Sequence, residues 1–129
     1  MKILILSDDF PPHSPGGAGL IAYNLAREFL GRGHEVVVIT TVRSSKDAGV
    51  FNEQGLVIHR LATLYNLFFQ TYVGLWNPVA VKAVKKIMTD FQPDVVHAHN
   101  VHGYLSYRSL VEAKRSGARV ILTTHDVMT

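Results

Sequence analysis

The chain has 129 residues, of which 47% are hydrophobic and 18% are charged, and its formal net charge is +3. This length suits one domain with a sizeable core, and the composition is typical of a soluble globular protein. The sequence contains no run of about twenty apolar residues, so it predicts no membrane-spanning helix. No basic stretch of the kind that opens a secretory signal precedes the first apolar run. The absence of cysteine excludes disulfides and thiolate chemistry. The mild positive charge allows anionic partners, but we expect no nucleic acid among them.

Five short apolar runs predict the strands of a largely parallel sheet. Most are continuous stretches of aliphatic or β-branched residues, the pattern of strands that are buried on both faces. They cover residues 2–7, 35–41, 56–60, 95–99 and 119–124.

Helical patterns alternate with these strands. The first spans about residues 18–32 and ends at the glycine stop Gly31-Arg32-Gly33. The second begins at Asn77-Pro78, an N-cap followed by proline, and the third covers about residues 106–116. Strands and helices that alternate in this way predict right-handed βαβ units. The expected fold is therefore an α/β, Rossmann-like three-layer sandwich with a mostly parallel sheet.

Two segments do not fit the alternation. Residues 42–54 are polar and contain glycine, so we expect a mobile surface loop there. Residues 61–76 are rich in large side chains, including Tyr65, Phe68 and Trp76, and match no pattern that we can assign.

A loop rich in proline and glycine connects the first strand to the first helix. Its three prolines stiffen the backbone, whereas Gly16, Gly17 and Gly19 leave space where a Cβ would obstruct a ligand. Unpaired N–H groups at the start of the following helix face that space and favour an anion. The loop therefore predicts a site for a phosphate-bearing substrate, with a purely structural glycine turn as the alternative.

Residues 17–22 also match the G-x-G-x-x-A pattern of dinucleotide-binding folds. The match is weak, because nine residues separate the first strand from Gly17. The acidic residue expected after the second strand is also missing, since Thr40-Thr41-Val42-Arg43 stands there. NAD binding is therefore disfavoured.

Two histidines end the fourth predicted strand. His97 and His99 are two residues apart, so their side chains share one face of the sheet and could hold a metal together with His125. A metal-dependent hydrolase that uses these three residues is thus an alternative function. In the other interpretation one imidazole packs and forms hydrogen bonds while the other lines a cleft.

A basic stripe marks the second helix, where Lys82, Lys85 and Lys86 lie opposite its apolar side. A solvated helix face explains this stripe, and so would contact with an anionic membrane surface. We expect a cytoplasmic protein, with peripheral contact at the inner face of the membrane as the open alternative.

Four short motifs follow one another along essentially the whole chain: Phe10-Pro11-Pro12 with Gly16-Gly17, Gly33 to Val38, Pro93 to His99, and Thr123 to Asp126. In this order and spacing they resemble the N-terminal domain of GT-B glycosyltransferases of the retaining family 4 (group 1) type. The resemblance implies two facing Rossmann-like domains with the reaction in the cleft between them. Residues 1–129 would form the N-terminal, acceptor-side domain. The C-terminal nucleotide-sugar domain would be absent from this chain, which would then be inactive alone.

The same resemblance assigns site residues. Gly16 and Gly17 would lie against the donor diphosphate, His125 would reach the donor sugar at the reaction centre, and Asp126 would shape the site. Three further residues would line the acceptor side of the cleft: His13, His99 and Asn100. The family usually needs no metal, so we expect no cofactor and treat the nucleotide-diphosphate sugar as a substrate.

The implied enzyme is a hexosyltransferase-like protein that acts on a glycan, a lipid-linked acceptor or a small molecule. Hydrogen-bond donors aimed at the departing phosphate would lower the barrier. The leaving phosphate would take the acceptor's proton, so retention would need no carboxylate pair. A non-catalytic domain that binds a sugar or a lipid headgroup is the second alternative.

Overall fold

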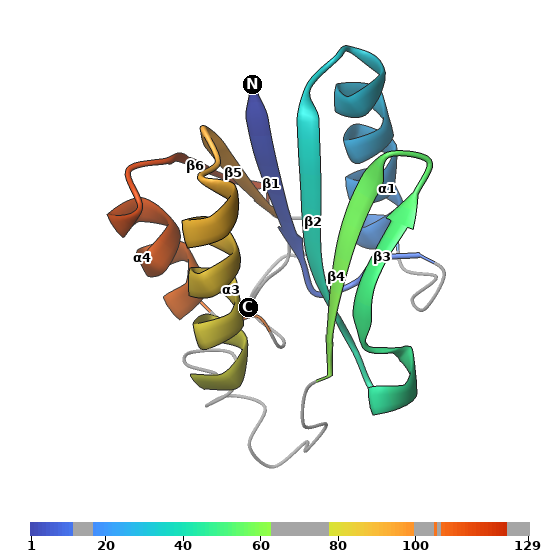
Figure 1. Cartoon of the computed structure of the whole chain (residues 1–129), viewed down its shortest axis with the longest axis vertical. Helices are drawn as coiled ribbons and strands as arrows, with labels where there is room; N and C mark the ends of the chain where they lie inside the picture. The colour runs from blue at the N-terminus through green and yellow to red at the C-terminus, as the bar shows by residue number, and fades with distance from the viewer. Residues whose placement is uncertain (12–16, 63–77, 100–104, 106, 124–129) are drawn as a thin grey trace.

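The computed structural model describes residues 1–11, 17–62, 78–99, 105 and 107–123. Within these residues a six-stranded sheet has helix α1 on one face and helices α3 and α4 on the other (Figure 1). The strand order is β3-β4-β2-β1-β5-β6, and every neighbouring pair is parallel except β3 with β4. The expected Rossmann-like α/β sandwich is therefore confirmed.

The element bounds follow the apolar runs of the sequence closely. The parallel strands are β1 (Lys2–Ser7), β2 (Glu35–Val42), β4 (Leu56–Ala62), β5 (Val95–His99) and β6 (Arg119–Thr123). The helices are α1 (Gly17–Gly31), α3 (Pro78–Phe91) and α4 (Arg108–Arg115).

The expectation of a mobile loop over residues 42–54 is wrong. That segment contains the short 3-10 helix η1 (Ser45–Asp47) and strand β3 (Gly49–Glu53), which pairs antiparallel with β4. The two strands are joined at Gln54 and Gly55, whose φ angles of 51° and 93° are both positive, as in the tight turns that favour hairpins. Gln54 is an unusual residue at such a position, so the turn carries no Asn-Gly or Asp-Gly signal. The aromatic residues Tyr65, Phe68 and Trp76 lie outside the described residues.

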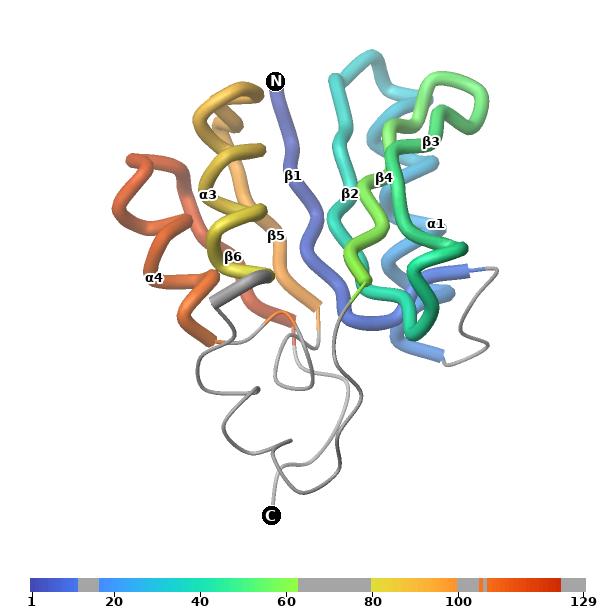
Figure 2. The backbone as a smooth tube through the Cα atoms, turned by 60° about the horizontal axis from the view of Figure 1, so that its bottom comes forward, coloured from blue at the N-terminus to red at the C-terminus, as the bar shows by residue number. Residues whose placement is uncertain are grey.

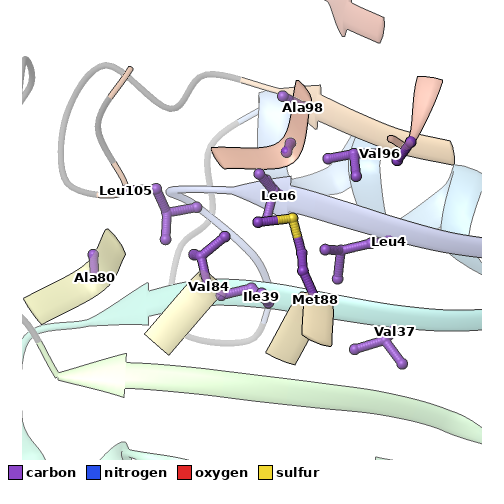
Figure 3. Packing of buried hydrophobic residues seen from close by; sticks show 12 residues of the cluster. Leu4, Leu6, Val37, Ile39, Ala80, Val84, Met88, Val96, Ala98 and Leu105 are labelled. Atoms are coloured by element: carbon purple, nitrogen blue, oxygen red, sulfur yellow. The ribbon is translucent and has the colours of Figure 1, made fainter. Parts of the chain in front are cut away.

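Two apolar clusters hold the layers together. Leu4, Leu6, Val84 and Met88 belong to the cluster between the sheet and helices α3 and α4 (Figure 3). The other cluster lies between the sheet and α1 and includes Ile3, Ile5, Val38, Ile58 and Ala22. Successive residues of a strand point to opposite faces, so each central strand contributes to both clusters. This burial explains why the strands are continuous apolar runs.

Candidate active site

The carboxyl ends of the five parallel strands meet at one edge of the sheet. Helix α1 follows β1 and therefore begins at this edge, while α3 and α4 follow β4 and β5 (Figure 2). Ligands of open α/β sheets bind at the carboxyl edge. Among the candidate residues that the structure describes, His99 ends β5 at this edge and Gly17 begins α1 there.

A row of polar side chains crosses the α1 face where the strands end. The row consists of five residues on adjacent strands: Arg60, Thr40, Ser7, His99 and Thr123. Thr40 is paired with Arg60, Ser7 with His99, and His99 with Thr123. Apart from Thr123, all members are buried. Buried polar groups are costly unless they are hydrogen-bonded, so this polar row marks an end of the sheet that is not built for packing alone.

Asp8 joins three parts of the carboxyl edge and is only 6% exposed. Its backbone oxygen accepts hydrogen bonds from the hydroxyls of Thr41 at 2.9 Å and Thr40 at 3.3 Å, both on β2. Its side-chain Oδ1 accepts a 2.7 Å hydrogen bond from the backbone N–H of Leu105, just before α4. The first residue after β1 is thereby tied to β2 and to the β5–α4 connection. Sequence reasoning missed this role, whose signal was an acid directly after a buried strand.

The two described glycines of the first turn of α1 differ in their surroundings. A Cβ added to Gly19 would lie 3.0 Å from the backbone carbon and oxygen of Asp9, so this glycine lets the helix approach the loop. Among the described residues, a Cβ added to Gly17 would meet nothing within 4 Å, and Gly17 is exposed. The structural interpretation therefore holds for Gly19, whereas Gly17 borders open space.

The start of α1 also suits an anion electrostatically. Its first turn, all of which is described, contains no acidic side chain. The positive end of the helix dipole is thus not offset by a carboxylate of that turn, and free N–H groups favour a bound anion there.

The two histidines of β5 lie against each other on the α1 face. Their ring centroids are 4.1 Å apart, and His97 Nε2 lies 2.8 Å from the hydroxyl oxygen of Thr123. His99 is fully buried, which agrees with the interpretation that one imidazole packs inside the domain. Within the described part of the chain, no three histidine, aspartate or glutamate residues are placed to hold a metal ion.

The remaining selected residues lie outside the described part of the chain: His13, Gly16, Asn100, His125 and Asp126. Their assignments stay predictions, as does the role of Gly17. Across the described ranges, no helix combines the length and apolar character needed to cross a bilayer.

The fold and its carboxyl edge define a Rossmann-like domain of the kind that GT-B glycosyltransferases contain. The solved catalytic domain of starch synthase IV from Arabidopsis thaliana, bound to ADP and acarbose, aligns with a TM-score of 0.66 and 15% identity. The alignment covers 96% of this chain and 34% of that chain. At this identity the likeness shows a shared fold.

Residues 15–129 match the model of Glycosyltransferase Family 4, and the chain belongs to that family. It is 25% identical to a component of the phosphatidylinositol N-acetylglucosaminyltransferase of Arabidopsis thaliana, over 98% of this chain and 28% of the relative. It is 28% identical to glycogen synthase of Mycobacterium tuberculosis, over 78% of this chain and 28% of the relative. The chain therefore spans little more than a quarter of the length of these two relatives.

Proposed function

We propose that this chain is the N-terminal, acceptor-side domain of a retaining glycosyltransferase, which moves a hexosyl group from a nucleotide-diphosphate sugar to a glycan, lipid-linked or small-molecule acceptor. The observation that carries the proposal is the start of α1, where exposed Gly17 borders open space at the carboxyl edge of a family 4 domain. ADP in the starch synthase structure is a nucleoside diphosphate, the leaving group that such a reaction releases.

The proposed chemistry assigns the glycine loop to the leaving group. Backbone N–H groups at Gly16 and Gly17 would donate to the diphosphate and stabilise the charge that builds up as the glycosidic bond breaks. His125 would donate a hydrogen bond to the donor sugar at the reaction centre, and Asp126 would help to shape that site. The acceptor would lie along His13 and Asn100, and His99, which is buried, would support that side of the site without touching the acceptor.

The proposal includes a second domain and no metal. The C-terminal domain of the same protein would bind most of the nucleotide sugar, in keeping with the greater length of both relatives. Helix N-termini and basic side chains would offset the charge of the diphosphate in place of a metal ion. A cytoplasmic location fits a supply of nucleotide sugars.

The test is transfer from a panel of UDP-, ADP- and GDP-sugars by the natural full-length protein and its His125→Ala variant. We expect turnover to fall by about a hundredfold or more, the scale for losing one transition-state contact, with an unchanged melting temperature. His34→Ala at the amino end of β2 is the matched control and should retain turnover. Near-normal turnover of His125→Ala, or a large fall in its melting temperature, would remove His125 from the mechanism. Transfer by residues 1–129 alone would contradict the need for the second domain.

A metal-dependent hydrolase is the second candidate, and the adjacent rings of His97 and His99 favour it. Elemental analysis of the purified full-length protein separates the two functions. The transferase proposal predicts no stoichiometric zinc or iron. A full equivalent of either metal that is lost in His97→Ala would support the hydrolase instead.

A further inference from the structure

The charge of this domain is concentrated in two helices. Together α3 and α4 contain six lysine or arginine residues and two acids, a net charge of +4. The whole chain has a net charge of +3, so all other residues together carry −1. Helix α1 on the opposite face contains one arginine and one glutamate and is neutral.

The six cations belong to one layer of the molecule. Helices α3 and α4 lie side by side over the same face of the sheet (Figures 1 and 2). Lys82, Lys85 and Lys86 recur at helical spacing and are exposed, whereas Val84 and Met88 of the same helix are buried. We call the outer surface of this layer the basic face, and it comprises Lys82, Lys85, Lys86, Arg108, Lys114 and Arg115.

Few acids neutralise the basic face. Glu112 lies 3.7 Å from Arg108 and 3.4 Å from Arg115, so one carboxylate serves two guanidinium groups. Among the described residues, no ion pair involves Lys82, Lys85, Lys86 or Lys114. Asp90, exposed one helical turn from Lys86, is the second acid of these helices, and with both acids counted they keep a net charge of +4.

Apolar surface adjoins these cations. An open groove of about 580 Å³ runs beside α4 and is lined by Leu110, Val111 and Val120 together with Lys114 and Arg115. Val111 and Leu122 are 40% and 44% exposed. Leu122 shares the sheet face of Val120, because the two residues are two apart on β6. Cations beside exposed aliphatic side chains are the composition of surfaces that lie on anionic bilayers.

We propose that the basic face binds an anionic lipid surface. Lysine and arginine side chains contact the phosphate headgroups, while Val111, Leu122 and the groove beside α4 meet the boundary of the acyl chains. The apolar component favours a membrane over nucleic acid, whose phosphates would need the cations alone. Both helices start at the carboxyl edge, so this orientation brings that edge beside the membrane. The binding itself does not depend on the proposed sugar transfer.

The experiment is co-sedimentation of the natural full-length protein with phosphatidylcholine vesicles that contain about 30% phosphatidylglycerol, at low ionic strength. The test variant combines Lys82→Glu, Lys85→Glu and Lys86→Glu. A charge-matched control combines Arg32→Glu, Lys46→Glu and Arg119→Glu, which are exposed positions outside the basic face. Circular dichroism melts of each variant check that it is folded.

We expect the parent and the control to bind anionic vesicles and the test variant to bind at least tenfold more weakly, since each cation adds to the attraction. Pure phosphatidylcholine vesicles should retain none of them. Leu122→Ser, with every cation in place, should weaken binding several-fold. The proposal is overturned if the parent does not bind, if control and test variants lose binding equally, or if the parent binds a DNA duplex more tightly than the vesicles.

Discussion

The two faces of the sheet are built from the same strands but end differently at the carboxyl edge. On the α3–α4 face the last buried side chains, Leu6, Ile39 and Ala98, are apolar. On the α1 face several are polar, because Ser7 and Thr40 directly follow Leu6 and Ile39 along their strands, although β2 ends on this face in the buried Val42. A step of one residue moves a side chain to the other face. One face therefore serves mainly to stabilise the domain, while the other concentrates polar groups beside the candidate active site.

We expect the largest difference in the free energy of unfolding between variants of two neighbouring residues on β1, Leu6 and Ser7. Leu6 is fully buried in the cluster under α3 and α4, so Leu6→Ala should lower the free energy of unfolding by about 2–5 kcal/mol. Ser7→Ala removes one hydrogen bond, from Ser7 Oγ to the backbone oxygen of Asp9, and should cost about 1 kcal/mol. Urea unfolding of both variants measures the difference. Equal losses would contradict the division of roles between the two faces.

Asp8 tests whether the carboxyl edge is held by specific hydrogen bonds. Asp8→Ala leaves the buried N–H of Leu105 without its acceptor and should cost about 1–3 kcal/mol. Asp8→Asn keeps an oxygen in that position and should cost less in the same urea titration. If the asparagine variant were as unstable as the alanine variant, the charge of Asp8 rather than its hydrogen bond would matter.

Alanine variants of Gly17 and Gly19, which lie in one turn of α1, should differ less in stability. Gly19→Ala places a Cβ against the backbone of Asp9 and should destabilise the domain by about 1–3 kcal/mol. The new Cβ of Gly17→Ala meets no atom of the described residues, so this change should be neutral or stabilise the helix by up to about 1 kcal/mol. Thermal unfolding of the two single variants decides between them. A loss of stability in Gly17→Ala similar to that in Gly19→Ala would make both glycines structural.

The smallest expected effect is a pH dependence of stability caused by His59, which lies on the α3–α4 face in register with Ile39. Burial lowers the pKa of His59 below its ordinary value of 6.5. Below pH 6.5 the unfolded chain therefore binds a proton that the folded chain resists, and stability falls as the pH falls. The urea midpoint of the parent should fall more steeply than that of His59→Gln between about pH 7 and pH 5. Parallel curves for parent and variant would show that folding leaves this pKa unchanged.

Sequence reasoning predicted the alternating elements well, because buried parallel strands and amphipathic helices leave strong apolar patterns. It missed β3, since Gly49–Glu53 is largely exposed and its hairpin turn uses Gln54 at a positive φ angle. The glycine motif identified the start of α1, but only the packing distances separated Gly17 from Gly19. The polar row depends on the register between strands distant in sequence, which no local pattern reveals. The position of Asp8 directly after a buried strand marks it in the sequence, but its hydrogen-bond partners Thr40, Thr41 and Leu105 are apparent only in the fold.

The most direct test of the proposed donor site is turnover by Gly17→Val and Gly17→Ala in the natural full-length protein, each measured beside its urea midpoint. The proposal predicts that valine, which fills the space next to the start of α1, abolishes most transfer while the midpoint changes little. Alanine should retain more activity than valine. Normal turnover with Gly17→Val would contradict the assignment of this loop to the donor diphosphate.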